Sequence, residues 1–519
     1  MKVEAILSVK DVRRMLAIFM LACLICTFGV ADFFLKYLYQ PVNRHGAFEI
    51  LGLGVIKSLP VSMMLISLLL AKARFIRIAG VVFTVMFFVV SSVEIWMQYN
   101  FHMAIGGNWL PLILSSSTQE VVEFISGYMT LPGLVGSLAW IMAMTFVCWS
   151  ISLVHPMAKR RVAIAVFFAG LCAFFAIDVI FKGSLNLSAV TFWRATLKSY
   201  VEERALKSCR EYSVPDFVKG DSPVLGVIVI GESATRNHMS LYGYQRETTP
   251  RLDAIRDELI VFSNLTANVL ETRVALRYLF TDATLSNKGK VNITLSKLCK
   301  KTNASSVLIS NQGHWGGLDS VEDLIFYFCD KKIYCSELGL PPPVYDNAIV
   351  LPLKNCMEIF STCERSVYFL HLYGSHSPFD CRCPEAERIF EDDLCDKLSS
   401  SVPTGHRRRK YNQYDNSIGF TDKILGEIID DVRKYRKPSF VLYLSDHGES
   451  PSAEGWRVAT DKDCWDIPLV IWLSPEYFSS YPDVVAYLAR RCDAVVSSVD
   501  MMNIFIKLLL ITGYEKEGH

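Results

Sequence analysis

The sequence lacks an excess of charge of either sign. Its 519 residues include 53 Lys and Arg against 52 Asp and Glu, so the formal net charge is +1. This balance argues against a strongly basic nucleic-acid-binding protein, and we expect no nucleic acid partner. Charged residues make up only 20% of the chain and hydrophobic residues 51%, which is too apolar for a disordered chain or an ordinary cytosolic protein.

The chain also lacks an internal repeat and a tight CxxC…CxxC pattern, which argues against a structural zinc ribbon. Fifteen cysteines are present; four lie in N-terminal apolar runs and the other eleven lie from Cys209 onward. Many scattered cysteines in a soluble domain are typical of an oxidising compartment. The short-range pairs that could form disulfides are Cys381 or Cys383 with Cys395, Cys356 with Cys363, and Cys329 with Cys335.

Long apolar runs are confined to the N-terminal part of the chain. A helix needs about 20 apolar residues to cross a ~30 Å hydrocarbon core. The first run has no small-residue cleavage site after it, so we interpret it as a span and not as a signal peptide. We therefore expect a five-helix transmembrane domain over residues 1–182, with spans near 14–36, 49–71, 75–98, 132–154 and 162–182.

The loops between these runs differ in their basic residues. Basic residues precede the first run and fill two short loops, whereas the loop 99–131 has no Lys or Arg. The positive-inside rule places the basic segments on the cytoplasmic side. Five spans then place residues 183–519 outside the cytoplasm. The basic residues are Lys2, Lys10, Arg13, Arg14, Lys72, Arg74, Arg77, Lys159, Arg160 and Arg161.

Within the loop 99–131, residues 113–124 have the pattern of a capped amphipathic helix. Ser116 and Glu120 are four residues apart, so they share one helical face. On spacing alone, the favoured interpretation is a capping serine and a solvated glutamate.

Residues 183–221 are a predicted linker with an interfacial helix over 189–210, and residues 222–519 form a soluble domain. Apolar runs in this domain end in polar residues and are separated by helical stretches, which indicates an α/β fold with a largely parallel central sheet. The predicted strands are 224–230, 306–310, 367–372, 440–444 and 467–472.

Two of these strands end in candidate metal ligands. Glu232 follows the first strand, and Asp446 and His447 follow the fourth. Active sites of such folds gather at the carboxyl ends of strands. Two carboxylates and an imidazole would leave one position of a tetrahedral Zn²⁺ for a nucleophile, which the metal would acidify. Each residue alone is more often structural, but together they predict a metal site.

The stretch 227–252, VIVIGESATRNHMSLYGYQRETTPRL, resembles the signature of bacterial membrane-bound phosphoethanolamine transferases. These belong to the alkaline phosphatase and sulfatase superfamily. The resemblance covers nearly the whole chain, including the predicted five-span half. Further matching motifs are SNQG at 310–313, HLYGSHSP at 371–378, YDNSI at 414–418 and YLSDHGES at 443–450.

The resemblance implies a threonine nucleophile downstream of the signature glutamate Glu232, and the matching position is Thr272. It implies that Glu232, Thr272, Asp446 and His447 hold one Zn²⁺. His376 would lie nearby, helping to bind phosphate, a second metal or the leaving group. Ser116 and Glu120 would lie near the donor lipid. Rival hydroxyls are those of Ser233 and Thr235.

The chain departs from the family pattern in two places. Leu270, Glu271 and Arg273 surround Thr272 where the family often has small residues and a cysteine. No histidine follows a dozen residues after His447, so we expect one zinc site and no complete second one. Asp461 or Asp463 could substitute, although both are more typical of loop carboxylates.

The resemblance implies a function in the bacterial inner membrane, with the catalytic domain in the periplasm. The enzyme, expected to be a monomer among membrane lipids, would transfer phosphoethanolamine from phosphatidylethanolamine to lipopolysaccharide, at lipid A or a core sugar, or to another envelope glycan. Two alternatives remain: a glycerol phosphate transferase similar to lipoteichoic acid synthase, and a membrane-anchored binding protein with a decayed site.

Overall fold

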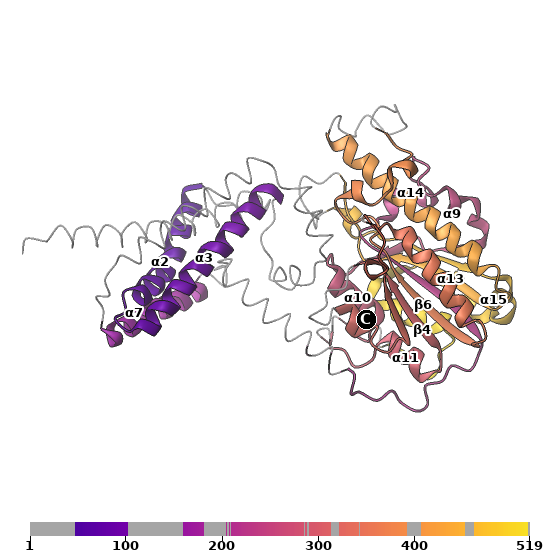
Figure 1. Ribbon diagram of the computed structural model, residues 1–519, viewed down its shortest axis with the longest axis horizontal. Coiled ribbons are helices and arrows are strands. Elements are labelled where there is room, and N and C mark those ends of the chain that lie inside the picture. The colour runs from indigo at the N-terminus through magenta and orange to yellow at the C-terminus, as the bar shows by residue number, and fades with distance from the viewer. Residues whose placement is uncertain are drawn as a thin grey trace, which may run out of the picture. The chain divides into compact units, whose positions relative to one another are not determined.

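The computed structural model describes residues 47–101, 159–180, 204, 207, 209–284, 286–287, 290–312, 321–341, 343–391, 406–451 and 461–516. The chain divides into two compact units (Figure 1). One holds the N-terminal helices, and the other holds the described residues from Cys209 onward.

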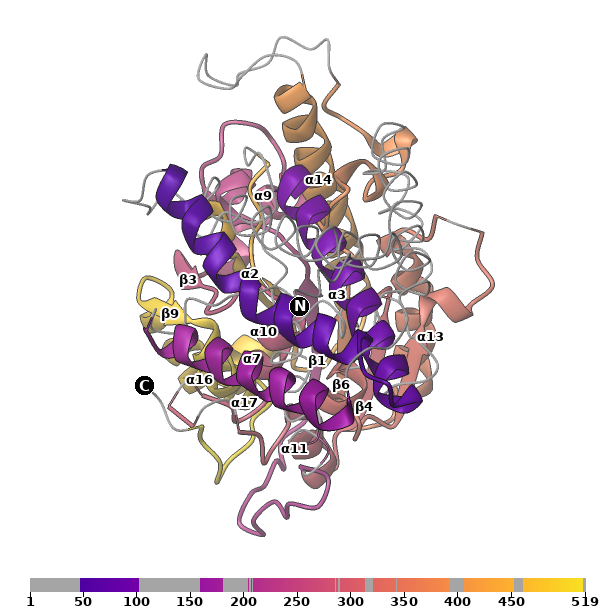
Figure 2. The same ribbon diagram turned by 90° about the vertical axis from the view of Figure 1, so that its left-hand side faces the viewer.

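Three helices are described in the first unit, and they coincide with three of the predicted apolar spans. They are α2 (Ala47–Leu69), α3 (Arg74–Phe101) and α7 (Arg160–Ile180). Helix α2 packs beside both of the others (Figures 1 and 2). Gly170 of α7 allows close approach, because a Cβ there would lie 2.8 Å from Met64 Cγ.

Among the residues that the structure describes, no helix is both long and apolar enough to cross a membrane. The predicted spans 14–36 and 132–154 lie outside the described residues, as does most of the predicted interfacial helix. The count of five spans therefore stays a prediction.

In the described part of the second unit, seven strands form one sheet in the order β2-β8-β7-β1-β6-β4-β5. All neighbours from β7 to β5 pair in parallel, and β8 is antiparallel to both β7 and β2. The prediction of a largely parallel sheet is confirmed. The strands are β1 (Val224–Gly231), β2 (Leu259–Val261), β4 (Ser305–Ser310), β5 (Lys331–Tyr334), β6 (Arg365–His371), β7 (Ser439–Ser445) and β8 (Leu469–Leu473), and a separate parallel pair is β3 (Asn264–Thr266) with β9 (Val495–Ser497).

Helices cover both faces of the sheet, which is why the central strands are apolar on both sides. Ile228 and Ile230 of β1 belong to one core cluster, with α10 (Thr272–Phe280), α11 (Leu295–Lys301) and α17 (Met501–Leu508). Val227 and Val229 belong to the other, with α13 (Val350–Ile359) and α14 (His406–Val432). Figure 1 shows α10 and α13 on opposite sides of β6. The remaining α-helices described in this unit are α9 (Pro250–Ala254), α12 (Val321–Ile325), α15 (Pro475–Ser480) and α16 (Pro482–Arg491).

The five predicted strands are all present, as β1, β4, β6, β7 and β8. Four further strands were not predicted from the sequence: β2, β3, β5 and β9, which are only three or four residues long. Strands this short carry too little periodic pattern to be separated from turns.

The predicted disulfides are wrong for the two pairs in which both cysteines are described. Cys329 packs against the first core cluster and Cys335 lies in the second, so the sheet separates them. Cys356 is buried in the second cluster, and the Cys363 thiol accepts a hydrogen bond from Ser305. The third pairing, of Cys381 or Cys383 with Cys395, stays a prediction, because Cys395 lies outside the described residues. The two corrected pairs give no structural support to the oxidising compartment inferred from the number of cysteines.

Candidate metal centre

The sheet topology brings Glu232, Asp446 and His447 together. β1 and β7 are neighbours, and Gly231 pairs with Ser445 at their carboxyl ends. Glu232 follows Gly231, and Asp446 and His447 follow Ser445, so all three emerge at one edge. One ligand atom from each lies within 4.8 Å of the others, and all three residues are buried. The predicted cluster is present.

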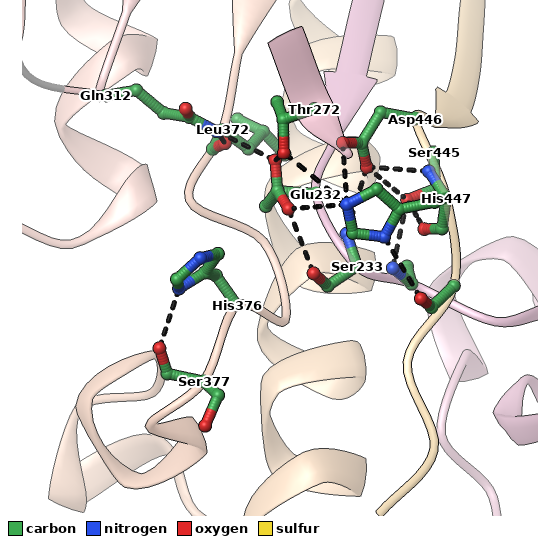
Figure 3. A network of polar contacts seen from close by, with 12 residues as sticks. Glu232, Ser233, Thr272, Gln312, Leu372, His376, Ser377, Ser445, Asp446 and His447 are labelled. Carbon is green, nitrogen blue, oxygen red and sulfur yellow. Dashed lines mark hydrogen bonds and ion pairs between the residues drawn. The ribbon is translucent and has the colours of Figure 1, made fainter. Parts of the chain in front are cut away.

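The orientation of His447 indicates a positive charge at the centre of this cluster (Figure 3). Its Nδ1 lies 3.0 Å from the carbonyl oxygen of Gly448. A carbonyl only accepts, so Nδ1 carries the proton and the neutral ring has its lone pair on Nε2. That Nε2 lies 3.3 Å from Glu232 Oε1 and 3.1 Å from Asp446 Oδ2. A lone pair facing two carboxylates is repulsive unless a cation or a second ring proton lies between them.

The donor set fits Zn²⁺. Two carboxylates and one imidazole are ligands that zinc takes, and a backbone partner on the other ring nitrogen is a common arrangement of zinc-binding histidines. Burial favours a bound ion further, because two carboxylates in a dry site need compensation.

Thr272 supplies a hydroxyl at this site. It is the first residue of α10, and its Oγ1 lies 2.9 Å from Glu232 Oε2 and 3.4 Å from His447 Nε2. The amino end of a helix carries partial positive charge, which favours an anionic group there. The predicted nucleophile therefore lies beside the three predicted ligands.

The two rival hydroxyls differ in position. Thr235 Oγ1 donates to the backbone oxygen of Asp466 at 2.9 Å and is not directed at the cluster. Ser233 Oγ donates to Glu232 Oε1 at 2.9 Å, so it is committed to orienting a ligand.

Gln312 is a site residue to which the sequence analysis assigned no role. Its Nε2 donates to the Leu372 carbonyl at 2.9 Å and to Glu232 Oε2 at 3.3 Å. The sequence feature that could have identified it is the SNQG motif, which begins at the last residue of β4.

His376 lies to one side of the cluster. Its Nδ1 lies 2.6 Å from the backbone oxygen of Ser377, and Figure 3 draws the ring apart from the network around Glu232. Ser116 and Glu120 lie outside the described residues. Asp461 caps a short 3₁₀ helix and Asp463 accepts from Asn237, as loop carboxylates do.

A buried ion pair lies at the end of β6, beside the cluster. His371 Nδ1 lies 2.7 Å from Glu322 Oε1, and His371 pairs with Ile230 two residues before Glu232. Burial alone would lower the pKa of His371, but the charge and hydrogen bond of Glu322, with Glu232 and Asp446, raise that pKa above its ordinary value. This pair was not predicted from the sequence, because Glu322 and His371 are 49 residues apart along the chain.

Other motif residues hold the loop after β1 in place. Asp415 of α14 accepts from Arg246 at 2.6 Å and Tyr244 at 3.0 Å, and it contacts His238 Nδ1 at 2.6 Å. All of these side chains belong to the motifs that carry the family resemblance, and here they support the loop and lie outside the metal cluster.

Comparisons with known proteins agree with this geometry. The sulfatase family model matches residues 225–511. A 279-residue stretch is 27% identical to phosphoethanolamine transferase EptC of Escherichia coli strain K12, covering 51% of this chain and 47% of that protein. Kdo(2)-lipid A phosphoethanolamine 7''-transferase of the same strain is 24% identical over 282 residues, covering 52% and 47%. The chain thus spans about half the length of these relatives.

Solved structures extend the comparison. The C-terminal periplasmic domain of E. coli EptC in complex with Zn matches with a TM-score of 0.52 and 25% identity, over 58% of this chain and 88% of that one. The integral membrane protein lipooligosaccharide phosphoethanolamine transferase A of Neisseria meningitidis matches with a TM-score of 0.70 and 20% identity, over 94% and 96%. At 20% identity, the likeness to the Neisseria protein shows the fold alone.

Proposed function

The chain belongs to the sulfatase family, and on that basis we propose that it is a phosphoethanolamine transferase. The observation that carries the proposal is the Thr272 hydroxyl, 2.9 Å from Glu232 in a buried cluster with Asp446 and His447. The names of the relatives support this reaction: one is a phosphoethanolamine transferase, and another is a Kdo(2)-lipid A phosphoethanolamine 7''-transferase. The proposed donor is phosphatidylethanolamine, and the proposed acceptor is lipopolysaccharide at lipid A or a core sugar.

In the proposed reaction, Thr272 Oγ1 attacks the phosphorus of the donor phosphodiester. A bond forms between Oγ1 and phosphorus, the bond from phosphorus to the glycerol oxygen breaks, and diacylglycerol leaves with a proton. Glu232 Oε2 accepts the hydrogen bond of the Thr272 hydroxyl and is positioned to hold its proton. The acceptor hydroxyl then attacks the same phosphorus: its oxygen bonds to phosphorus, the bond from phosphorus to Thr272 Oγ1 breaks, and the acceptor's proton passes to Thr272 Oγ1.

We propose that Glu232, Asp446, His447 and Thr272 hold Zn²⁺ at a single site. Bound there, Zn²⁺ would lower the pKa of the Thr272 hydroxyl and stabilise negative charge on the phosphoryl oxygens. The intact ligand set argues against a binding protein with a decayed site, because decay would be expected to remove at least one of these costly buried charges.

The membrane setting is part of the proposal. We propose a five-span domain over 1–182, insertion in the bacterial inner membrane and a periplasmic catalytic domain over 222–519, reached through the linker 183–221. Ser116, Glu120 and His376 would contact the donor head group or phosphate. A carboxylate at Glu120 would suit the ethanolamine ammonium, since Coulomb attraction is less screened in a partly dehydrated interface.

Mass spectrometry of envelope glycolipids tests the function. We expect cells carrying the protein to contain glycolipid with added phosphoethanolamine, and cells carrying Thr272→Ala to lack it. Added glycerol phosphate would instead identify the alternative transferase. Unchanged glycolipids, from a chain that is present and holds Zn²⁺, would contradict both transferase functions.

A further inference from the structure

Ser233 has an unusual backbone conformation for its position. Its φ is +58°, in the left-handed region that residues with a side chain seldom adopt, and it is fully buried beside Glu232. Such strain persists only where surrounding contacts hold it, and it is concentrated at functional sites. Asn303 and Leu510 also have positive φ, but neither belongs to the metal cluster.

Ser233 contacts both carboxylates of the cluster. Its backbone N–H donates to Asp446 Oδ1 at 3.1 Å, and its hydroxyl donates to Glu232 Oε1 at 2.9 Å. One oxygen of each carboxylate is thereby oriented by the same residue. The other oxygens are Glu232 Oε2, which faces Thr272, and Asp446 Oδ2, which faces His447 Nε2.

Tyr414 of α14 holds the backbone around Ser233. Its hydroxyl donates to the Ser233 carbonyl at 2.8 Å and accepts from the Thr235 N–H at 2.9 Å. Burial raises the pKa of Tyr414 well above its ordinary value, so the hydroxyl keeps the proton that it donates. Ser445 adds a third contact, because its Oγ accepts from the Ala234 N–H at 2.9 Å.

We propose that Ser233 and Tyr414 are positioning residues that orient Glu232 and Asp446 for the metal ion before it binds. This inference rests on the proposed metal site and deepens it. The cost of ordering the two carboxylates is met when the chain folds, so less of the binding free energy of the ion is lost to ordering them. Partners of metal ligands typically account for roughly 10–100-fold in metal affinity.

The test measures the Zn²⁺ dissociation constant of the full-length chain by competition with a chromophoric chelator. We expect Tyr414→Phe and Ser233→Ala each to weaken Zn²⁺ binding by about tenfold or more. Thermal unfolding of the metal-free variants is recorded beside it, because a merely structural hydroxyl would lower the melting temperature and leave the dissociation constant unchanged.

Two remote residues provide matched controls. The Tyr477 hydroxyl is also buried and donates to a backbone carbonyl, that of Leu508, at 2.9 Å. Ser296 Oγ is buried and donates to the Ile325 carbonyl at 2.6 Å. We expect Tyr477→Phe and Ser296→Ala to lower the melting temperature and to keep the wild-type dissociation constant.

Ser233→Gly serves if Ser233→Ala does not fold. Glycine adopts the positive φ of this position without strain and keeps the N–H donated to Asp446, so only the hydroxyl contact to Glu232 is lost. Wild-type Zn²⁺ affinity in both Tyr414→Phe and the folded Ser233 variant would overturn the positioning role. A wild-type chain that binds no Zn²⁺ would overturn the metal site and this role together, whereas a chain that binds Zn²⁺ and transfers nothing would overturn only the proposed reaction.

Discussion

At the scale of single residues, the site combines groups whose chemistry was readable in the sequence with groups whose chemistry was not. Glu232, Asp446 and His447 are buried and adjacent, as predicted from their places after strands. Thr272 completes the constellation through one hydrogen bond to Glu232. The Gly448 carbonyl places the proton of His447 on Nδ1, which leaves the lone pair of Nε2 facing Glu232 and Asp446.

Replacing the proposed nucleophile separates chemistry from metal binding. Thr272→Ala removes the attacking oxygen, so we expect transfer to fall by roughly 10³-fold or more. Zn²⁺ should remain bound through the other three ligands. Thr272→Ser is the matched control, because it keeps a hydroxyl at the first residue of α10. Transfer and zinc content are measured on the same preparations. Wild-type transfer by Thr272→Ala would exclude Thr272 as the nucleophile.

Glu120→Gln tests the proposed head-group contact. Loss of the carboxylate removes attraction for the ethanolamine ammonium, so we expect the KM for phosphatidylethanolamine to rise several-fold. Zinc content should not change. Kinetics at several donor concentrations, with a melting curve, separate this from a capping role. A lower melting temperature with an unchanged KM would leave Glu120 as a solvated helix residue.

At the scale of elements, the loops after the parallel strands position the site by packing on one another. Gly374, in the loop after β6, has φ +54°, and a Cβ there would lie 2.6 Å from the Glu232 carbonyl oxygen. The next residue, Ser375, donates its N–H to that same oxygen at 2.8 Å. The backbone of Glu232 is therefore held between the ends of β1 and β6.

Gly374→Ala should displace Glu232. The substitution adds backbone strain and a collision, so we expect a loss of stability of about 1 kcal/mol or more and weaker Zn²⁺ binding. Gly243→Ala is a matched control: its φ is +94°, but a Cβ there would meet no atom within 4 Å. It should cost stability and leave Zn²⁺ affinity unchanged. Equal Zn²⁺ affinity in the two variants would contradict the clamping of Glu232 by the loop after β6.

Asp422 couples two helices and makes the stability of this contact depend on pH. The carboxylate of α14 accepts from the Arg251 and Leu252 N–H groups at the start of α9, at 2.8 and 3.0 Å. Burial raises the pKa of Asp422 to about 7. Because the folded state holds the proton more tightly than the unfolded state, this group lowers stability as pH rises from about 4 to about 7.

Asp422→Asn should remove this dependence, because the amide carries no charge; its one oxygen accepts from one of the two N–H groups, and the loss of the other contact does not vary with pH. We expect the variant to gain in melting temperature relative to wild type between pH 5 and pH 8. The check is a series of melting curves at several pH values. Asp430→Asn is a control, since Asp430 is exposed and pairs with Arg251 at the surface. A difference between variant and wild type that stays constant across the series would contradict the raised pKa.

At the scale of the whole molecule, the chain joins an apolar N-terminal region to a sulfatase-family domain. The likeness of fold to the solved integral membrane transferase extends over 94% of the chain, with a TM-score of 0.70. The described helices α2, α3 and α7 coincide with three predicted apolar segments. The orientation across a membrane rests on the distribution of Lys and Arg.

A reporter that is active only in the cytoplasm tests that orientation. Fused after Gly518, it should be silent, because the five predicted spans, with the basic loops in the cytoplasm, would place the C-terminal domain on the other side. The same reporter fused within the basic loop near Lys159 should be active and serves as the control. Strong reporter activity after Gly518 would contradict the predicted topology and the periplasmic location of the C-terminal domain.

The sequence alone determined the central strands and the grouping of the three candidate metal ligands. Buried parallel strands are continuous apolar runs, which makes β1, β4, β6 and β7 visible without a structure. Parallel pairing places their carboxyl ends at one edge of the sheet. Glu232, Asp446 and His447 could therefore be grouped, although the first lies far along the chain from the other two.

Only the tertiary structure decided which face of the sheet each residue occupies. Neighbouring cysteines such as Cys329 and Cys335 looked like partners, but they lie in different core clusters and remain thiols. Ser233 was a rival nucleophile on its sequence position, but in the structure it has a positive φ, its hydroxyl donates to Glu232, and its backbone contacts Asp446 and Tyr414. The face, the register and the backbone conformation of a residue depend on contacts between segments that are distant in the sequence. A local sequence pattern does not predict those contacts.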